Sequence, residues 1–537
     1  MRETISEEKI KLVDLFSGAG GLSLGFMKTG KFDLVAAAEN DKYAQETYVS
    51  NHETNADFVM ISDVVGYDFT KLTEQFGEID IVIGGPPCQG FSNSNRQKNY
   101  IISKNNSLVK EFFRAIIELK PKAFVMENVE MFESNTHRFY DSTSDHNFIK
   151  SLGIALENEK VPVSTKSFEE LDMLNISQSP ELVDSLLLPE KLNNLLRVFN
   201  KHKNNETRRV KYIEKNRKVI CNQIEQYFCS PHDSEFGAFI DQRLQDVYIG
   251  LKEQKDFVTY RVSLSDLMDL QKTLRTIEEI YDNEIICHFE LSDDKSLSCT
   301  VHSYTVIDYI NAVLNGEYFQ NSSVINARWF DIPQERKRFI FGGIRNDIMK
   351  DPNGTVRLPL APLSIKDITV ADAIFDLLPY EVSYDAFNDK GQLFINQNNL
   401  SDYAKSMRDS EMLHNHIVTN TTAVALERFR AIEEGENFHS LDANLKKNYS
   451  DPARTQKTIY LRLKGTEPSG TVVNVRKSMW IHPRLDRAVS VREAARLQSF
   501  PDSFVFKGTK DSQYQQVGNA VPPLMAKAIA ECILEYL

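Results

Sequence analysis

The sequence predicts an α/β protein whose core is a doubly wound, Rossmann-like parallel sheet. Apolar runs alternate with helical patterns over the first 130 residues, and two of these runs are each followed directly by a glycine-rich turn. Strands that alternate with helices form βαβ units, in which successive strands lie parallel. Both observations favour a sheet whose carboxyl edge carries the functional loops.

The elements of this core follow one another in a regular order. Buried strands are predicted over Lys11–Phe16, Leu34–Ala38 and Ile79–Ile83, because each of them is a short apolar run. An amphipathic helix is predicted over Leu108–Leu119, and Phe124–Met126 predicts another short strand. Together these elements make residues 1–131 the first part of the core.

Residues 132–320 have a different composition, with few glycines and long polar stretches rich in Leu and Lys. Two of these stretches, Ser179–Lys218 and Ser263–Tyr281, have the apolar spacing of helices, so we expect a mainly helical insertion. Its segment Lys201–Lys218 holds eight Lys or Arg against two Glu. Such a segment either contacts a phosphate backbone or forms a solvated helix face, and the sequence leaves both open.

After the insertion the chain is expected to return to the core twice. We assign residues 321–379 and 484–537 to the core. Residues 380–483 show no lasting period and are rich in Asn, Asp, Gly and Pro, which predicts a loop-rich domain. The predicted elements are strands over Arg328–Phe330 and Arg338–Gly342 and helices over Thr369–Leu378, Ser490–Gln498 and Pro523–Tyr536.

The composition indicates a globular protein of the cytoplasm. Of 537 residues, 41% are hydrophobic and 26% are charged, which suffices to bury two or three domain cores. The sequence has no run of 18 apolar residues and begins with a polar segment, so we expect no membrane span. Six widely spaced cysteines without a C-x-x-C pair argue against disulfides and against a structural metal site.

The formal net charge of −13 argues against binding to nucleic acid, because Lys and Arg dominate contacts to phosphates. This objection weakens if basic residues cluster in one cleft, since net charge says little about a local site.

A glycine-rich turn, Asp14–Gly21, follows the first predicted strand. Its glycines would let the backbone approach a ligand closely. Glu39, at the end of the second strand, could accept hydrogen bonds from ribose hydroxyls. Asp63, where a third strand should end, could accept from an adenine amino group or simply cap a turn. Alone, these residues fit an adenosyl cofactor, NAD or an ordinary turn.

A second turn, Gly84–Ser92 with the sequence GGPPCQGFS, follows the strand Ile79–Ile83. Cys88 would therefore lie on a rigid loop at the carboxyl edge of the sheet, where open α/β folds bind ligands. A lone cysteine is more often a small buried hydrophobe than a nucleophile. The surrounding Gly and Pro form a shaped turn that core packing does not require, which favours a nucleophile here.

With these blocks in place, the chain resembles the family of DNA cytosine-5 methyltransferases. The family carries a Gly-Pro-Pro-Cys-Gln-Gly-Phe-Ser nucleophile loop, and five further blocks of this chain resemble family blocks in the family's order. These are Asp14–Gly21, Met126–Val129 (MENV), Gln334–Arg338 (QERKR), Val491–Pro501 (VREAARLQSFP) and Gln516–Pro522 (QVGNAVP). Six ordered blocks spanning most of the chain make a coincidence implausible.

The resemblance implies a methyltransferase core that depends on S-adenosyl-L-methionine and reacts covalently with cytosine. Cys88 would add its thiolate to carbon 6 of the base, which makes carbon 5 nucleophilic. Glu127 would donate a proton or a strong hydrogen bond to ring nitrogen 3. Arg338, together with Arg336, would hold the carbonyl oxygen of the base. The group that removes the carbon-5 proton is not identified, and water suffices.

The same resemblance implies the residues that bind the cofactor and the DNA. The cofactor-binding residues would be Phe16, Gly18, Gly20, Gly21, Glu39, Asp63, Pro86 and Asn519. The DNA-binding residues would be Gln89, Ser92, Arg96 and Gln334.

The base must leave the duplex to react, because its ring is inaccessible inside the stack. The segment Asn93–Ser107 would close over the flipped base, although it has fewer glycines than the family pattern and lacks its Asp-x-Arg. Residues 380–483 would recognise the target sequence. Within them, His414–His416 and Arg462 are candidates for DNA contacts or for surface roles.

The implied biology is a bacterial, cytoplasmic enzyme that acts as a monomer on double-stranded DNA. It would be a modification methylase with a restriction endonuclease as its genetic partner, or a solitary enzyme of the same type.

Three other functions remain as alternatives. A transfer-RNA cytosine-5 methyltransferase of the same family is the nearest, although its relatives have a compact chain without a region like residues 380–483. An NAD-dependent oxidoreductase gives no role to the Pro-Pro-Cys loop. A non-catalytic DNA-binding protein predicts the loss of Cys88 or Glu127, and both are present.

Overall fold

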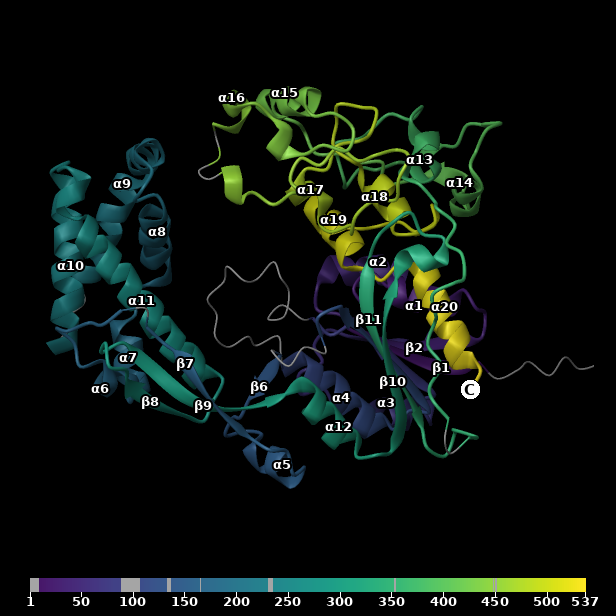
Figure 1. Ribbon diagram of the computed structural model, residues 1–537, viewed down its shortest axis with the longest axis horizontal. Coiled ribbons are helices and arrows are strands. Elements are labelled where there is room, and N and C mark those ends of the chain that lie inside the picture. The colour runs from purple at the N-terminus through teal and green to yellow at the C-terminus, as the bar shows by residue number, and fades with distance from the viewer. Residues whose placement is uncertain are drawn as a thin grey trace, which may run out of the picture. The chain divides into compact units, whose positions relative to one another are not determined.

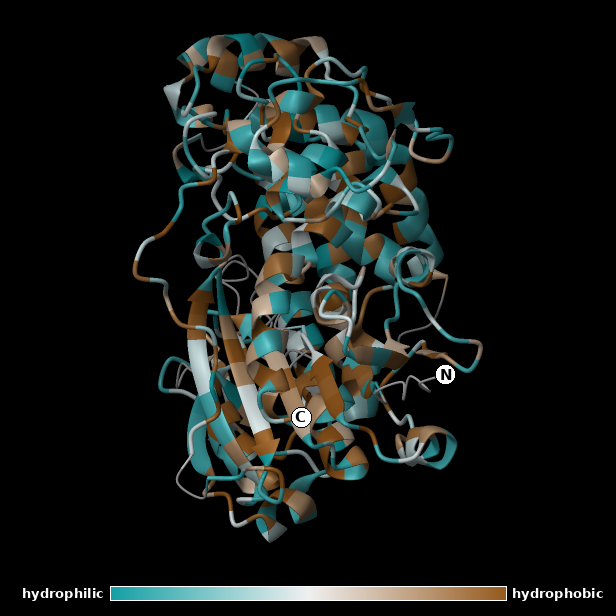
Figure 2. Cartoon of the chain, turned by 90° about the vertical axis from the view of Figure 1, so that its right-hand side faces the viewer, coloured by the Kyte–Doolittle hydropathy of each residue, from teal (hydrophilic) through white to brown (hydrophobic). Residues whose placement is uncertain are grey.

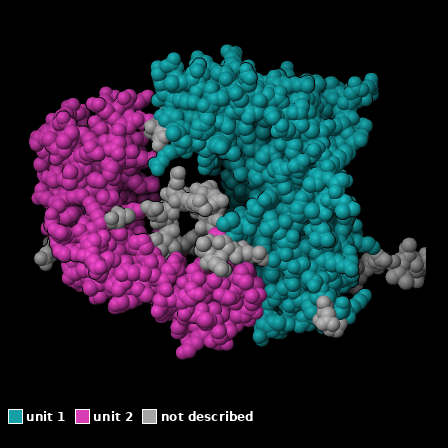
Figure 3. All heavy atoms as spheres, in the orientation of Figure 1, with its two compact units in different colours: residues 1–92, 105–134, 313–537 teal, residues 93–104, 135–312 magenta. Residues whose placement is uncertain are grey.

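The computed structural model describes residues 9–87, 107–132, 137–164, 166–229, 235–351, 354–447, 449 and 452–537. Contacts between residues divide the chain into two compact units, which Figure 3 draws in teal and magenta. The described part of unit 2 lies between residues 137 and 312, and the other described residues belong to unit 1.

Unit 1 is built around a mostly parallel sheet, in which seven strands of the described chain take the order β10-β11-β5-β4-β1-β2-β3 (Figure 1). Strands β1 to β5 are parallel, whereas β11 runs antiparallel to β5 and β10 antiparallel to β11. The strands are β1 Ile10–Leu15, β2 Phe32–Ala38, β3 Val59–Ile61, β4 Ile81–Gly84, β5 Ala123–Val129, β10 Tyr318–Asn326 and β11 Lys337–Arg345. The predicted doubly wound α/β core is confirmed.

Helices cover both faces of this sheet because most residues of its parallel strands are apolar and buried; several strands in Figure 2 are mainly brown, although others carry white and teal stretches. On one face, Leu12 and Ile83 form a core with α1 and α20. On the other, Phe113 of α4 meets Phe124 of β5 with ring centroids 6.1 Å apart. The helices next to the sheet are α1 Gly21–Met27, α2 Lys42–Asn51, α3 Thr70–Phe76, α4 Ser107–Leu119 and α20 Pro523–Leu534.

The last stretch of the chain, Lys510–Leu534, has the length and composition of a membrane-crossing helix. It is two helices, α19 Lys510–Asn519 and α20, and most of the stretch is buried inside the protein. α20 packs tightly on α1, since a Cβ atom on Gly25 would lie 2.4 Å from the Cβ of Ala526. The apolar residues of this stretch are therefore explained by packing in the core of unit 1.

The remainder of unit 1 is loop-rich with short elements, as predicted for residues 380–483. The elements are α13 Val370–Ile374, β12 Gln392–Leu393, α14 Asp402–Met407, β13 Met412–Leu413, α15 Ala423–Ala431, α16 Ala443–Lys446, α17 Val475–Ser478 and α18 Val491–Leu497. The strand predicted over Arg328–Phe330 is wrong, because Ala327–Phe330 forms a 3-10 turn. The Asn326 side chain caps this turn by accepting the N–H of Arg328.

Unit 2 combines a helical cluster with an antiparallel sheet. Helices α8 to α11 pack together around a core that includes Leu196, Leu244 and Leu274 (Figure 1). The helices are α5 His146–Ser151, α6 Met173–Ser177, α7 Pro180–Leu186, α8 Glu190–Lys201, α9 Glu206–Phe228, α10 Glu235–Lys252, α11 Arg261–Asp282 and, at the junction with unit 1, α12 Val306–Leu314. The helical prediction holds for this part, but the sheet was not predicted.

The sheet of unit 2 contains β6 Arg138–Tyr140, β7 Glu157–Pro162, β8 Cys287–Leu291 and β9 Leu297–Thr305. Strands β6, β7 and β8 all pair antiparallel with β9. In the β6–β9 pair Arg138 lies opposite Thr305. The first described strand of unit 2 therefore pairs with its last strand, which is followed by α12.

Candidate active site

The parallel strands of unit 1 end together at one edge of the sheet, and three loops of interest begin there. Leu15 at the end of β1 lies opposite Gly84 of β4, and Gly84 lies opposite Met126 of β5. Strand order reverses between β1 and β4, which makes this edge the topological switch point where open α/β sheets bind ligands.

The glycine-rich loop after β1 requires glycine at two positions, each for a different reason. Gly20 has φ +94°, and a Cβ atom there would lie 2.2 Å from the ring of His52. Gly18 has φ +55°, and none of the described atoms around it lies within 4 Å of its Cβ position. Glycine is thus needed at position 20 because a side chain would clash with His52. At position 18 it leaves open space beside the loop, which a ligand can occupy.

Glu39, at the end of β2, fixes the shape of this loop. Its Oε2 accepts a hydrogen bond from the N–H of Gly18 at 2.9 Å, and its Oε1 accepts from the N–H of Asp41 at 2.8 Å. Burial raises the pKa of Glu39, and the bonds from Asp41 and Gly18 oppose that rise. The carboxylate predicted to accept hydrogen bonds from ribose hydroxyls therefore contacts the backbone of the loop.

The terminal block of the chain returns to this loop. A Cβ atom on Gly21 would lie 2.3 Å from the carbonyl oxygen of Val521, so the two backbones are in close contact. Asn519 is exposed, and its Oδ1 accepts from the side chain of Gln515 at 2.7 Å. Buried Ser17 Oγ has no hydrogen-bond partner among the described residues. The open backbone at Gly18, the carboxylate of Glu39 and the hydroxyl of Ser17 can form hydrogen bonds with a cofactor that carries hydroxyl and amino groups.

Asp14 lies completely buried beneath the loop. The hydroxyl of Tyr48 donates to its Oδ2 at 3.1 Å, and its Oδ1 has no partner within the described chain. Burial raises the pKa of Asp14 from 3.8 to about 7, against the hydrogen bonds from Ser23 and Tyr48 that lower it. The folded protein therefore binds a proton at Asp14 more readily than the unfolded chain does.

We expect Asp14→Asn to stabilise unit 1 relative to the native protein more at pH 8 than at pH 5.5. Because the folded pKa exceeds the unfolded one, the native protein loses stability as pH rises from about 4 through about 7. Between the two pH values the difference in unfolding free energy should change by about 2 kcal/mol. Urea unfolding followed by the fluorescence of Trp329 and Trp480, both in unit 1, measures it.

The exposed Asp57→Asn is the control for the chemistry of the substitution itself. Parallel pH profiles for Asp14→Asn and the native protein would show that Asp14 titrates at an ordinary pH.

The loop after β4 is held by the end of β5. A Cβ atom on Gly85 would lie 3.1 Å from Oε2 of Glu127, so this carboxylate touches the start of the loop. The side-chain amide of Asn128 donates to the carbonyl of Pro86 at 3.1 Å. The predicted Glu-Asn-Val element therefore contacts the predicted nucleophile loop directly.

Glu127 also forms an ion pair with Arg338 of β11. The Nε of Arg338 lies 2.7 Å from Oε1 of Glu127, and both side chains are mostly buried. The Nη1 of Arg338 donates to the carbonyl of Lys337 at 2.7 Å, which fixes the guanidinium. Two predicted catalytic residues from separate blocks thus lie together at the edge of the sheet.

Several predicted residues lie outside the described part of the chain. These are Cys88, Gln89, Ser92 and Arg96, together with most of the predicted closing segment Asn93–Ser107. Pro86, predicted to bind the cofactor, is buried at the last described turn before Cys88. Phe16 has φ +56° at the end of β1, and Asp63 is exposed beyond β3, where its Oδ1 accepts from the N–H of Val65.

Arg336 does not reach the site, which corrects its predicted catalytic role. Its side chain is 1% exposed, and its guanidinium donates to the carbonyls of Val472, Gly518 and Ala520 at 2.9 to 3.2 Å. These contacts tie two distant segments together, so Arg336 is a positioning residue.

Gln334 is likewise buried, and the prediction that it contacts DNA is wrong. Its amide donates to Gln498 Oε1 at 2.8 Å and accepts from the N–H of Val472 at 2.7 Å. Arg462 is also buried, and donates to five backbone carbonyls and to Asp486. Asn415 and His416 are buried as well, so neither the surface role nor the DNA contact expected for them holds.

Sequence reasoning missed the residues that support the site from below. Asn128 was noted only as part of a block, although an amide next to a carboxylate at a strand end signals a loop clamp. His52 and Tyr48, whose rings stack 4.1 Å apart beneath Gly20, carry no sequence signal of their own. Their role depends on a packing contact between helix α2 and the loop.

Comparisons with known proteins agree with this geometry. The family model described as C-5 cytosine-specific DNA methylase matches residues 10–153 and 295–535. The chain is 24% identical to the type II methyltransferase M.DdeI of Desulfomicrobium norvegicum, over 98% of this chain and 89% of that protein. It is 26% identical to the DNA (cytosine-5-)-methyltransferase M.ApeKI of Aeropyrum pernix, over 98% of each chain.

A solved structure shares the fold. It is described as a candidate DNA modification methyltransferase encoded within a prophage of E. coli, with a TM-score of 0.53 and 18% identity over 98% of this chain and 99% of that one. Because the family model covers well over half of the sequence, the chain belongs to the family of C-5 cytosine-specific DNA methylases.

Proposed function

We propose that this chain methylates carbon 5 of a cytosine in duplex DNA, with Cys88 as the covalent nucleophile and S-adenosyl-L-methionine as the methyl donor. The observation that carries the proposal is the Glu127–Arg338 pair at 2.7 Å, whose carboxylate touches Gly85, three residues before Cys88. An acid and a cation beside a nucleophile loop are what activation of a cytosine ring needs.

The reaction begins with the base, because carbon 5 of cytosine is a poor nucleophile. The thiolate of Cys88 forms a bond to carbon 6, and the electrons of the ring double bond move onto the ring, toward carbon 5 and nitrogen 3. Glu127, after taking up a proton from solvent, donates it to nitrogen 3 as that negative charge develops, and takes it back when the sulfur leaves. Arg338 neutralises charge at the neighbouring carbonyl oxygen.

The bound cofactor would supply the methyl group on its sulfonium, so that as carbon 5 forms a bond to the methyl group the bond between sulfur and methyl breaks and a neutral thioether leaves. A base, for which water suffices, removes the proton from carbon 5. The electrons of that bond restore the double bond and release the sulfur of Cys88 as a thiolate. The ion pair with Arg338 orients Glu127 before the base arrives, so little rearrangement is needed during the reaction.

The cofactor would lie along the loop between β1 and α1. Glu39 would accept hydrogen bonds from the ribose hydroxyls of the cofactor. The open space beside Gly18 would let the cofactor approach the backbone of the loop closely. Phe16, Gly20, Gly21, Asp63, Pro86 and Asn519 complete the proposed binding set.

The cytosine must be flipped out of the duplex to reach this edge. We assign recognition of the target sequence to residues 380–483 and closure over the base to the segment that contains Arg96, with Gln89 and Ser92 near the DNA. The relatives called type II methyltransferases favour a modification enzyme that protects its host's DNA. Such an enzyme would act in the cytoplasm as a monomer, with a cognate endonuclease as its genetic partner.

Bisulfite sequencing of DNA from cells that express the chain tests this function. We expect 5-methylcytosine within one short sequence context, and none in cells that express Cys88→Ala. Methylation confined to transfer RNA, measured in the same cells, or the absence of 5-methylcytosine from both nucleic acids, would refute the proposal.

A further inference from the structure

Unit 2 carries a basic surface that the proposed function leaves unused. Although the chain has a net charge of −13, the segment Lys201–Lys218 holds eight Lys or Arg against two Glu. This segment joins the end of α8 to the first half of α9. We call the exposed side of α8 and the turn that follows it the α8–α9 surface.

The α8–α9 surface follows from the helical period of α8. Leu192, Leu196 and Phe199 form the buried side of the helix. Lys191, Arg197 and Lys201 are exposed. The helix thus uses its apolar side for the core and presents its cations to solvent.

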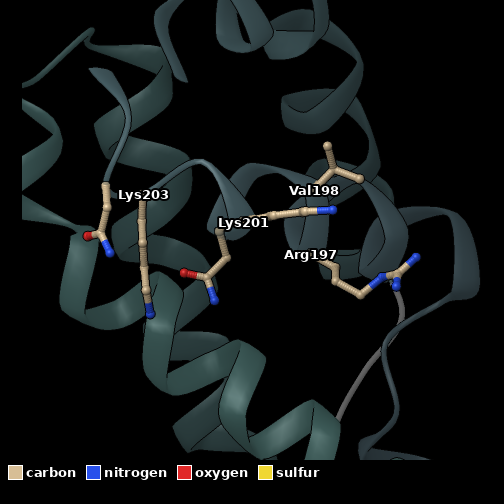
Figure 4. Close-up of a pocket in the computed structure, with 6 residues that line it drawn as sticks. Arg197, Val198, Lys201 and Lys203 are labelled. Carbon is tan, nitrogen blue, oxygen red and sulfur yellow. The ribbon is translucent and has the colours of Figure 1, made fainter. Parts of the chain in front are cut away.

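Two neighbouring hollows mark this surface. The first has a volume of about 470 Å³ and the second of about 500 Å³, and they meet at Val198. In Figure 4 the side chains of Arg197, Lys201 and Lys203 project from α8 and the following turn around the first hollow. The first is lined by Arg197, Val198, Asn200, Lys201, Lys203 and Asn204, and the second by Glu190, Lys191, Asn194, Leu195, Val198 and Tyr212.

Four cations of this surface form no ion pair within the described chain, unlike many others in unit 2: Lys191, Arg197, Lys201 and Lys203. Arg197 and Lys203 donate to neutral groups, the amide of Asn194 at 3.2 Å and the hydroxyl of Ser265 at 2.8 Å. By contrast, Lys166 pairs with Asp266 at 2.6 Å. Clustered cations without acidic partners repel one another, so an anionic partner would be stabilising here.

The neighbouring His202 responds to the positive charge of this surface. Burial lowers the pKa of His202, and the charges of Arg208 and Lys201 lower it further. The surface also rests on a rigid support, since the hydroxyl of Tyr212 in α9 donates to the carbonyl of Leu195 in α8 at 3.0 Å. A fixed array of cations suits a partner with regularly spaced negative charges.

We propose that the α8–α9 surface binds the sugar–phosphate backbone of duplex DNA, as a contact separate from the active site. From Lys191 to Lys201 the helix rises about 15 Å, which equals the axial rise of about four nucleotides in one strand of B-DNA. Lys, Arg and Asn side chains donate to phosphate oxygens without reading bases. The contact would therefore raise affinity without adding sequence preference, and this inference rests on the proposed action on DNA.

The test is a triple variant, Lys191→Gln, Arg197→Gln and Lys201→Gln, which removes three exposed charges and breaks no ion pair within the described part of the chain. The control triple, Lys150→Gln, Lys272→Gln and Lys295→Gln, removes three exposed charges elsewhere in unit 2. Binding of a labelled duplex is measured over a range of salt concentrations, together with methylation at saturating DNA.

We expect the test variant to bind duplexes with and without the target sequence about tenfold more weakly at physiological salt. The slope of log affinity against log salt should fall by about 2 to 3, because about 0.9 counterion is released per phosphate contact. The methylation rate at saturating DNA should equal that of the native protein, and the control should match the native protein throughout.

An unchanged slope and affinity in the test variant, with methylation intact, would overturn this inference and leave the proposed function standing. Absence of methylation by the native protein would instead overturn the proposed function. Weaker binding of a structured RNA alone, with duplex binding unchanged, would also refute a DNA contact at the α8–α9 surface.

Discussion

Replacement of Cys88 by alanine is expected to abolish methyl transfer to duplex DNA, by about 10⁴-fold or more. Without the sulfur no bond to carbon 6 can form, and carbon 5 keeps too little electron density to accept a methyl group. Transfer of a labelled methyl group from S-adenosylmethionine to duplex DNA measures the loss. Cofactor binding should persist, because Cys88 is not among the residues proposed to hold the cofactor, several of which lie on the loop after β1.

Cys229→Ala is the matched control, since Cys229 is an exposed cysteine of unit 2 and should have no effect. A duplex with 5-fluorocytosine at the target position should form a stable adduct with the native protein and with Cys229→Ala, but not with Cys88→Ala. Native rates in Cys88→Ala, or an adduct at another residue, would rule out the covalent mechanism.

Replacement of Glu127 by Gln should slow the chemical step by about 10²- to 10⁴-fold, the usual contribution of a positioned acid. Glutamine keeps the length of the side chain beside Gly85 but cannot supply a proton to nitrogen 3 of the base. The single-turnover rate of methylation measures this effect, while the dissociation constant for DNA should change little.

Glu130→Gln provides a control on the same stretch of chain. Glu130 is exposed and pairs with Lys337 at 3.1 Å, so its loss removes an ion pair of the same type without touching the loop. Such surface pairs contribute little, and the rate should stay native. Equal single-turnover rates in Glu127→Gln and Glu130→Gln would deny Glu127 its role in the chemistry.

The sequence predicted the strands of the core because each is a run of apolar residues that ends in a recognisable turn. It did so for β1 and β4, whose glycine loops mark the carboxyl edge of the sheet. It missed β10, which contains Gln320, Asn321 and two serines and is only partly buried. Polar strands at a sheet edge lack the apolar run that identifies a strand in sequence.

The sheet of unit 2 was missed for a related reason. Strand β7 has the sequence ENEKVP and is mostly exposed, so its residues resemble a loop or a solvated helix. Its pairing with β9 depends on contacts with residues about 140 positions away in the chain, for example Glu157 with Ser303. Local sequence patterns carry no information about partners at such distances.

The predicted site residues fall into two groups, those at the edge of the sheet and those buried in the protein. Glu127 and Arg338, whose roles the resemblance implied, lie near the end of β5 and the start of β11. Gln334 and Arg336 lie only two to four residues from Arg338, yet both are buried among backbone carbonyls. A motif shows that a polar residue matters, but only burial distinguishes contact with substrate from support of the fold.

The pairing of β6 with β9 has an evolutionary consequence. The pair holds Arg138, near the start of the described part of unit 2, and Thr305, just before α12, about one strand spacing apart, roughly 5 Å. The family model does not match residues 154–294, which lie inside this unit. An insertion whose first strand pairs with its last can change in length between these strands while the seven-stranded sheet keeps its own pairing.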